Sequence, residues 1–266
     1  INNRKVQHKE IKKILDLAKK NKIDIIDTAT GYLSDDSILK NLNHRFKFNS
    51  KINPDSNWTS YEHCKKKLQS HVKKMNSNIE ILLFHDTKIL FKEEGKKIFE
   101  NIKLLKKKGF FKKIGISIYN PNHLSYLTSK YDIEVVQCPY NIFDKRIIDS
   151  GWLKELKKNK IEVHARSIFL QGILFNKNYL KKKYFRKWKN HFDLWFEYLR
   201  KNKISEIDYC INDIINHDFD KIIIGIENFE NFKQLLNFKP LQNINEMIDL
   251  TNNDLKLIDP RKWKTA

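Results

Sequence analysis

Residues 79–85 read Ile79-Glu80-Ile81-Leu82-Leu83-Phe84-His85, a short apolar run that ends in a histidine. A run of this length and composition predicts a buried strand. Downstream, Ile98 and Ile102 recur at helical spacing, and Gly109 is expected to end that helix because glycine readily adopts a left-handed C-cap conformation. Residues 114–117 (Ile-Gly-Ile-Ser) then predict the next strand. A strand, a helix and another strand in this order indicate a parallel crossover.

The same alternation continues along most of the chain. We expect seven strands, at residues 23–27, 46–51, 79–85, 114–117, 135–138, 161–166 and 222–225. Repeated strand–helix units of this kind predict an α/β fold, a parallel (β/α) TIM-type barrel. A closed barrel has eight strands, so the pattern is one short. The shortage lies at the N-terminus, where a helix over residues 10–20 comes first, and we attribute it to truncation upstream.

Composition narrows the class of protein. No linker rich in Pro, Gly or Ser interrupts residues 1–266, which predicts a single domain. No apolar run approaches the roughly 20 residues of a membrane span. The three cysteines, Cys64, Cys138 and Cys210, are far apart and odd in number, which favours a reducing, cytoplasmic location. The histidines show no ligand spacing, so no metal site is expected.

The formal net charge of +20 invites a nucleic-acid interpretation. The lysines, however, are spread over nearly every predicted helix, and no recognition motif accompanies them. A compositional bias of the source genome explains this distribution better. We therefore expect no specific nucleic-acid partner and no membrane partner, and the sequence does not indicate an oligomeric state.

Four polar residues stand at or just beyond the ends of predicted strands: Asp27, Tyr32, Lys51 and His85. Parallel strands of one barrel bring such residues together at its C-terminal mouth, where barrel enzymes keep their chemistry. An aspartate at the end of a buried strand is costly unless it is paired, which favours a functional role over a loop role for Asp27.

Several segments carry a family resemblance through their joint order and spacing. They are residues 25–32, 82–86, 114–117, 135–141, 165–167, 171–172, 222–225 and 259–263. Together they resemble the aldo/keto reductase family over essentially the full chain. The resemblance implies reduction of an aldehyde or ketone, with sugars and small carbonyl compounds among the substrates, by a nicotinamide cofactor. The alternative is a non-catalytic barrel that binds a nicotinamide nucleotide for regulation.

The resemblance also implies a role for each of the four residues. Tyr32 would be the general acid, although a free phenol has a pKa of about 10. Lys51 would lower that pKa, and Asp27 would keep Lys51 charged and oriented. His85 would donate a hydrogen bond to the carbonyl oxygen of the substrate.

For the cofactor, the resemblance implies contacts from eight residues: Ser117, Asn120, Gln137, Arg166, Ser167, Gly225, Glu227 and Asn231. Ser117 and Gln137 would hold the nicotinamide carboxamide. Asn120 would substitute for an asparagine that the family often has at the position of Ile118. Arg166 falls where an aromatic side chain often stacks on the nicotinamide ring, and a guanidinium can stack similarly.

The end of the last strand bears on the choice of nucleotide. In the family, the turn and helix that begin around residues 225–229 bind the adenosine phosphates, since helix N-termini favour anions. NADPH is the usual cofactor of the family. Glu227 keeps NADH open, because a carboxylate repels a 2′-phosphate and can accept a hydrogen bond from a ribose hydroxyl.

The long segment at residues 173–203 is rich in aromatic side chains. Among these, Phe185 and Trp188 are expected either to cover the helices of the barrel or to form a lid over the substrate.

Overall fold

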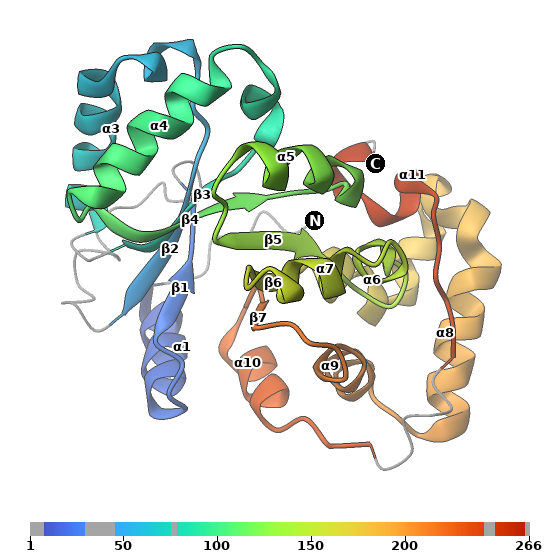
Figure 1. The fold of residues 1–266 in the computed structure, drawn as a ribbon. Coiled ribbons are helices and arrows are strands. Elements are labelled where there is room, and N and C mark those ends of the chain that lie inside the picture. Colours follow the sequence, from blue (N-terminus) through green and yellow to red (C-terminus); the bar gives the residue numbers. More distant parts are fainter. Residues whose placement is uncertain (1–7, 30–45, 76–78, 242–247, 264–266) are drawn as a thin grey trace.

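The computed structural model describes residues 8–29, 46–75, 79–241 and 248–263. Seven strands form one sheet in which each strand is parallel to the next along the chain (Figure 1). They are β1 (Ile25–Asp27), β2 (Lys47–Ile52), β3 (Ile79–Phe84), β4 (Phe111–Ser117), β5 (Val135–Pro139), β6 (Glu162–Arg166) and β7 (Lys221–Ile223). The seven predicted strands are confirmed, and the sheet curls into a nearly closed TIM-type barrel.

Helices cover the outside of this sheet (Figure 1). The longer ones are α1 (His8–Lys20), α3 (Tyr61–Met75), α4 (Gly95–Lys107), α5 (Leu124–Lys130), α7 (Trp152–Lys158), α8 (Lys189–Asn202), α9 (Glu206–Ile215) and α10 (Phe229–Leu236). Two single-turn helices, α6 (Arg146–Asp149) and α11 (Leu255–Ile258), complete the set of α-helices in the described residues. None of the described helices is long and apolar enough to cross a membrane.

The end of α4 shows how local sequence sets an element boundary. The helix ends at Lys107, and Gly109 has a φ of 80°, in the left-handed region that favours glycine. The chain then enters β4 directly. The predicted stop at Gly109 is therefore confirmed.

The barrel closes differently in its two layers. Within the described residues no hydrogen-bonded ladder joins β7 to β1, and the expected lack of a strand before the first helix falls on residues 1–7, outside the described part of the chain. In the outer layer, however, α1 packs against α10. The carboxylate of Glu10 accepts a hydrogen bond of 3.0 Å from the backbone N of Phe229, and Lys13 Nζ lies 5.9 Å from the Phe229 ring centroid. Helices α1 and α10 are thus in contact, whereas the described strands β1 and β7 are not paired.

Apolar side chains fill two regions outside the barrel. One lies between the sheet and the helices, and the other lies beneath α8, α9 and the C-terminal segment. Phe185 and Trp188 belong to the second region, with 4% and 7% of their surface exposed. Their burial supports the expected covering role for these two aromatics and not the lid.

The inside of the barrel is mostly polar. Its apolar part is the small cluster of Ile81, Leu83 and Val135. Strand registers place polar side chains on the same inward face, because side chains alternate along a strand. Asn49, Gln137 and His164 are fully buried there. This polar interior leads up to the C-terminal ends of the strands, where the candidate site lies.

Candidate active site

The centre of the site is an ion pair between Asp27 and Lys51. Asp27 ends β1 and stands beside Asn49 in β2, so Lys51, two residues further on, lies on the same face of the sheet. Lys51 Nζ donates a hydrogen bond to Asp27 Oδ1. The side chains are only 4% and 10% exposed, respectively. Charges so poorly hydrated persist because each compensates the other.

Gln137 completes the coordination of the Asp27 carboxylate. Its Nε2 donates a hydrogen bond of 2.9 Å to Asp27 Oδ2. This bond crosses the barrel interior from β5 to β1. The other end of the amide, Gln137 Oε1, is buried and has no hydrogen-bond partner. A free buried acceptor of this kind is uncommon and calls for an explanation such as an absent ligand.

His85 stands immediately after β3, on the next strand from Lys51. Its backbone N donates to the carbonyl oxygen of Ile52 at 2.8 Å, which continues the strand pairing by one residue. Burial lowers the pKa of the imidazole, and the positive charges of Lys51 and Arg166 lower this pKa further. The ring is therefore neutral near pH 7, with one nitrogen able to donate a hydrogen bond and the other able to accept one.

Arg166 ends β6 and lies half-buried at the mouth. Its Nη2 donates to the carbonyl oxygen of Ile118 at 3.0 Å, and its Nη1 donates to Ser167 Oγ at 3.2 Å. The guanidinium carbon lies 4.1 Å from the ring centroid of Tyr119. The guanidinium carbon of Arg261, from the C-terminal segment, lies 3.3 Å from the same centroid. Tyr119 therefore contacts both Arg166, at the end of β6, and Arg261, in the C-terminal segment.

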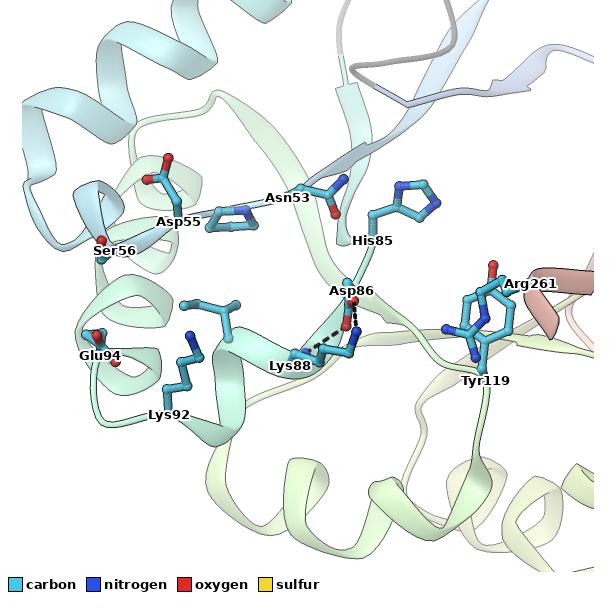
Figure 2. A pocket seen from close by; sticks show the side chains of 12 residues that line it. Asn53, Asp55, Ser56, His85, Asp86, Lys88, Lys92, Glu94, Tyr119 and Arg261 are labelled. Carbon is cyan, nitrogen blue, oxygen red and sulfur yellow. Dashed lines mark hydrogen bonds and ion pairs between the residues drawn. The ribbon is translucent and has the colours of Figure 1, made fainter. Parts of the chain in front are cut away.

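A cavity of about 890 Å³ opens beside His85. Figure 2 shows His85, Tyr119 and Arg261 on one side of it, with acidic and basic side chains from the segments after β2 and β3 around the rest. Asp86 and Lys88, which form an ion pair of 3.2 Å, belong to this wall. A small molecule can therefore reach the imidazole from a cavity whose surface is about equally polar and apolar.

Comparison with known protein families places the chain among oxidoreductases. The sequence profile of the aldo/keto reductase family matches residues 1–248. This chain belongs to the aldo/keto reductase family. A comparison with curated proteins found no match.

The structure is also similar to solved members of the family. Aldo-keto reductase AKR11C1 from Bacillus halodurans, in its holo form, superposes with a TM-score of 0.68 at 18% identity, over 90% of this chain and 84% of that one. Glycerol dehydrogenase AKR11B4 from Gluconobacter oxydans superposes with a TM-score of 0.59 at 15% identity, over 85% and 82%. At these identities the likeness establishes the fold.

Three of the four residues predicted for catalysis in this aldo/keto reductase are among the described residues. Asp27 and Lys51 are in contact, and the positive charge of Lys51 acts on His85. Tyr32 lies outside the described residues. Gln137 was predicted for the cofactor only, and its bond to the Asp27 carboxylate had no signal in the sequence.

The other residues predicted near the nicotinamide lie at the same end of the barrel. Ser117 ends β4 and is the register partner of Gln137. Asn120 caps the single-turn helix at Pro121–His123 by accepting a hydrogen bond of 3.1 Å from Asn122 N. Ser167 has a φ of 63° and accepts the hydrogen bond from Arg166.

The residues predicted for the adenosine half lie around the start of α10. Asn228 caps this helix by accepting a hydrogen bond of 2.8 Å from Asn231 N. Gly225 and Glu227 are exposed in the loop that leads into the cap. The carboxylate of Glu10 already accepts from the next backbone N–H, that of Phe229. Glu10 lies 219 residues away from Phe229 in sequence, which is why sequence patterns alone did not indicate it.

Two further residues of the mouth were missed, Tyr119 and Arg261. Tyr119 directly follows Ile118, where the family often has an asparagine. Arg261 lies in residues 259–263, one of the segments that resemble the family. No group of three or more His, Cys, Asp or Glu side chains able to hold a metal occurs in the part of the chain that the structure describes.

Proposed function

We propose that this aldo/keto reductase reduces an aldehyde or ketone to an alcohol, with Tyr32 as the general acid and a nicotinamide nucleotide as the cofactor. The observation that carries the proposal is the buried Asp27–Lys51 pair, held by Gln137 and adjoining His85 at the open end of the barrel. Structural ion pairs do occur in barrels, but the His85 imidazole, on which the charge of Lys51 acts, lines a cavity.

The arrangement suits the electrostatics of carbonyl reduction. When bound, the reduced nicotinamide supplies a hydride, and negative charge develops on the carbonyl oxygen of the substrate. The neutral imidazole of His85 donates a hydrogen bond to that oxygen and polarises the carbonyl group. Tyr32 then gives its proton to the same oxygen.

Lys51 makes this proton transfer feasible. An ammonium group near a phenol stabilises the phenolate and lowers the pKa of the tyrosine from about 10. Burial lowers the pKa of Lys51 itself, while the adjacent Asp27 carboxylate opposes this shift. Asp27 thereby keeps Lys51 protonated, and Gln137 holds the carboxylate in place.

The residues at the mouth fit the nicotinamide carboxamide. Gln137 Oε1 is a buried acceptor without a partner, and a carboxamide N–H would satisfy it. Ser117, beside Gln137 on the neighbouring strand, offers a hydroxyl to the same group. Asn120 uses its side-chain oxygen in the helix cap, which leaves its NH₂ group as a donor.

The start of α10 bears on the choice between NADPH, which the family generally binds, and NADH. The Glu10 carboxylate accepts the first backbone N–H of α10, and Glu227 stands in the preceding loop. The carboxylates near this helix end disfavour a 2′-phosphate, but the ammonium groups of Lys13 and Lys233 lie 5.9 and 4.9 Å from the Phe229 ring and favour it. NADPH therefore stays the expected cofactor, with NADH open.

The test combines nucleotide binding with turnover. NADH and NADPH are titrated into the protein and followed by nicotinamide fluorescence, and a panel of aldehydes and ketones is then screened for oxidation of the bound nucleotide. Tyr32→Phe should bind the nucleotide with unchanged affinity and lose at least about a hundredfold in kcat, because it lacks the acidic proton. Tyr126→Phe, at an exposed tyrosine that does not line the cavity, is the matched control.

Two results would contradict the proposal. Turnover that survives Tyr32→Phe would remove this tyrosine from the role of acid. Tight nucleotide binding by the unaltered protein without turnover of any carbonyl compound would favour the regulatory, non-catalytic barrel.

A further inference from the structure

Arg166 carries a positive charge that no carboxylate compensates among the described residues. Its polar contacts are the carbonyl oxygen of Ile118 and the hydroxyl of Ser167, and its aromatic contact is the ring of Tyr119. All three groups are neutral, and a guanidinium does not lose its proton in a protein. Two other cations of the mouth differ, because Lys51 is paired with Asp27 and Arg261 with Asp259.

The position of this charge relates it to the reacting atoms. Arg166 is the register partner of Pro139, two residues beyond Gln137 on the same face, so it stands one step closer to the open end of the barrel. Its charge is near enough to depress the pKa values of both Lys51 and His85. A carbonyl oxygen bound to His85 therefore lies within the field of Arg166.

A hydride donor must lie within the same field. Reacting atoms in a productive complex are about 3–3.5 Å apart, so a bound donor ring would lie against the carbonyl carbon. The reduced nicotinamide ring is neutral. After it transfers a hydride, which is two electrons and a proton, the ring carries one positive charge, while the carbonyl oxygen becomes an alkoxide and then takes a proton from Tyr32. The two redox forms of the cofactor thus differ by one charge next to the guanidinium.

We propose that Arg166 makes this site discriminate between the redox forms of the cofactor, binding the reduced nucleotide more tightly than the oxidised one. This inference rests on the proposed function. The uncompensated guanidinium repels the cationic ring and leaves the neutral ring unaffected, so it favours carbonyl reduction over alcohol oxidation and hastens release of the spent nucleotide. An aromatic side chain at this position would stack on either form without such a preference.

The test measures binding, independently of turnover. Dissociation constants for NADH and NAD⁺ are determined by isothermal titration calorimetry with the unaltered protein, Arg166→Met and Arg166→Lys. The unaltered protein should prefer NADH. Arg166→Met should reduce the ratio of the NAD⁺ to the NADH dissociation constant by about tenfold, mainly through tighter NAD⁺ binding, because one repulsive charge is gone. Arg166→Lys keeps a charge and should retain most of the preference.

Arg261→Met is the matched control. It removes the other guanidinium that contacts Tyr119, but that guanidinium is already paired with Asp259 at 2.7 Å. For this variant, the ratio of the NAD⁺ to the NADH dissociation constant should stay within about twofold of the value for the unaltered protein, because a compensated charge acts weakly at a distance. A change as large as that of Arg166→Met would show that the stack, and not the charge of Arg166, sets the preference, and would overturn the inference.

A measurement on the unaltered protein guards against misfolding of the methionine variant. Raising the salt concentration should lower the preference for NADH, since ions screen the repulsion. A ratio that is equal in the unaltered protein and Arg166→Met, and insensitive to salt, would overturn the inference while leaving the proposed function intact. Failure of the unaltered protein to bind either nucleotide would overturn both.

Discussion

Asp27 and Lys51 form an ion pair in which both charges have lost most of their contact with water. Removing one partner of such a pair leaves the other charge buried and uncompensated, which costs far more than the pair itself contributes. Function and stability therefore depend on the same two side chains.

Lys51→Met should lower the free energy of unfolding by about 3–5 kcal/mol, because the Asp27 carboxylate loses its counter-charge. Urea denaturation checks this. The double variant Asp27→Asn, Lys51→Met should recover at least half of the loss, since an amide can still accept the hydrogen bond from Gln137.

Lys112→Met is the control for this prediction. It breaks an ion pair with Glu80 in which the lysine is 66% exposed, and little change is expected there. A single variant Lys51→Met as stable as Lys112→Met would mean that water reaches Asp27 freely.

Adjacent strands approach closely at Gly115 in β4. A Cβ atom at this position would lie 2.8 Å from the carbonyl oxygen of Val135 and 3.3 Å from Leu83 Cδ2. The absence of a side chain therefore allows β3, β4 and β5 to pack together beneath the site.

Gly115→Ala should lower the free energy of unfolding by about 1–3 kcal/mol, because the added methyl group overpacks the sheet. Thermal and urea denaturation provide the measurement. At Gly225 an added Cβ would meet no heavy atom within 4 Å, so Gly225→Ala should change stability by less than about 0.5 kcal/mol. Equal losses in the two variants would rule out the close approach as the cause.

The elements were predictable from sequence because their signals are local. Most strands contain a short run of branched or aromatic residues, and Gly109 marks a helix end through its own backbone preference. The ends of parallel strands also indicated Asp27, Lys51 and His85 as neighbours. Contacts between separate segments carry no such local signal. Only the structure therefore shows the hydrogen bond from Gln137 to Asp27, the hydrogen bond that Glu10 accepts at the start of α10, and the stacking of Arg261 on Tyr119.

Several histidines across the molecule are buried or partly buried. Burial lowers the pKa values of His85, His164, His191 and His217. His164, inside the barrel, is the most enclosed, and its Nε2 lies 2.7 Å from Glu162 Oε1. Protonating these rings in the folded state is unfavourable.

The free energy of unfolding should therefore fall as the pH drops below about 6.5, the ordinary pKa of histidine. In that range the unfolded chain takes up protons that the folded protein does not, until the pH reaches the lowered pKa values of the folded state. Urea midpoints measured from pH 8 to pH 5 check this.

His164→Gln should flatten that dependence, because glutamine can still donate a hydrogen bond to Glu162 but does not titrate. His123→Gln, on the surface, should leave the dependence unchanged. A profile that is as steep without His164 as with it would assign the acid sensitivity to other groups.

The stacking of Arg261 on Tyr119 has a consequence for the order of events during translation. A ribosome that has just added Ile223 has made every described strand and both partners of the central ion pair, but not Arg261. Because chains begin to fold from the N-terminus as they emerge, the strands and their charged side chains are made before Arg261 is added. The nascent protein thus acquires most of the cavity wall together with its barrel, and the Arg261 side of that wall last.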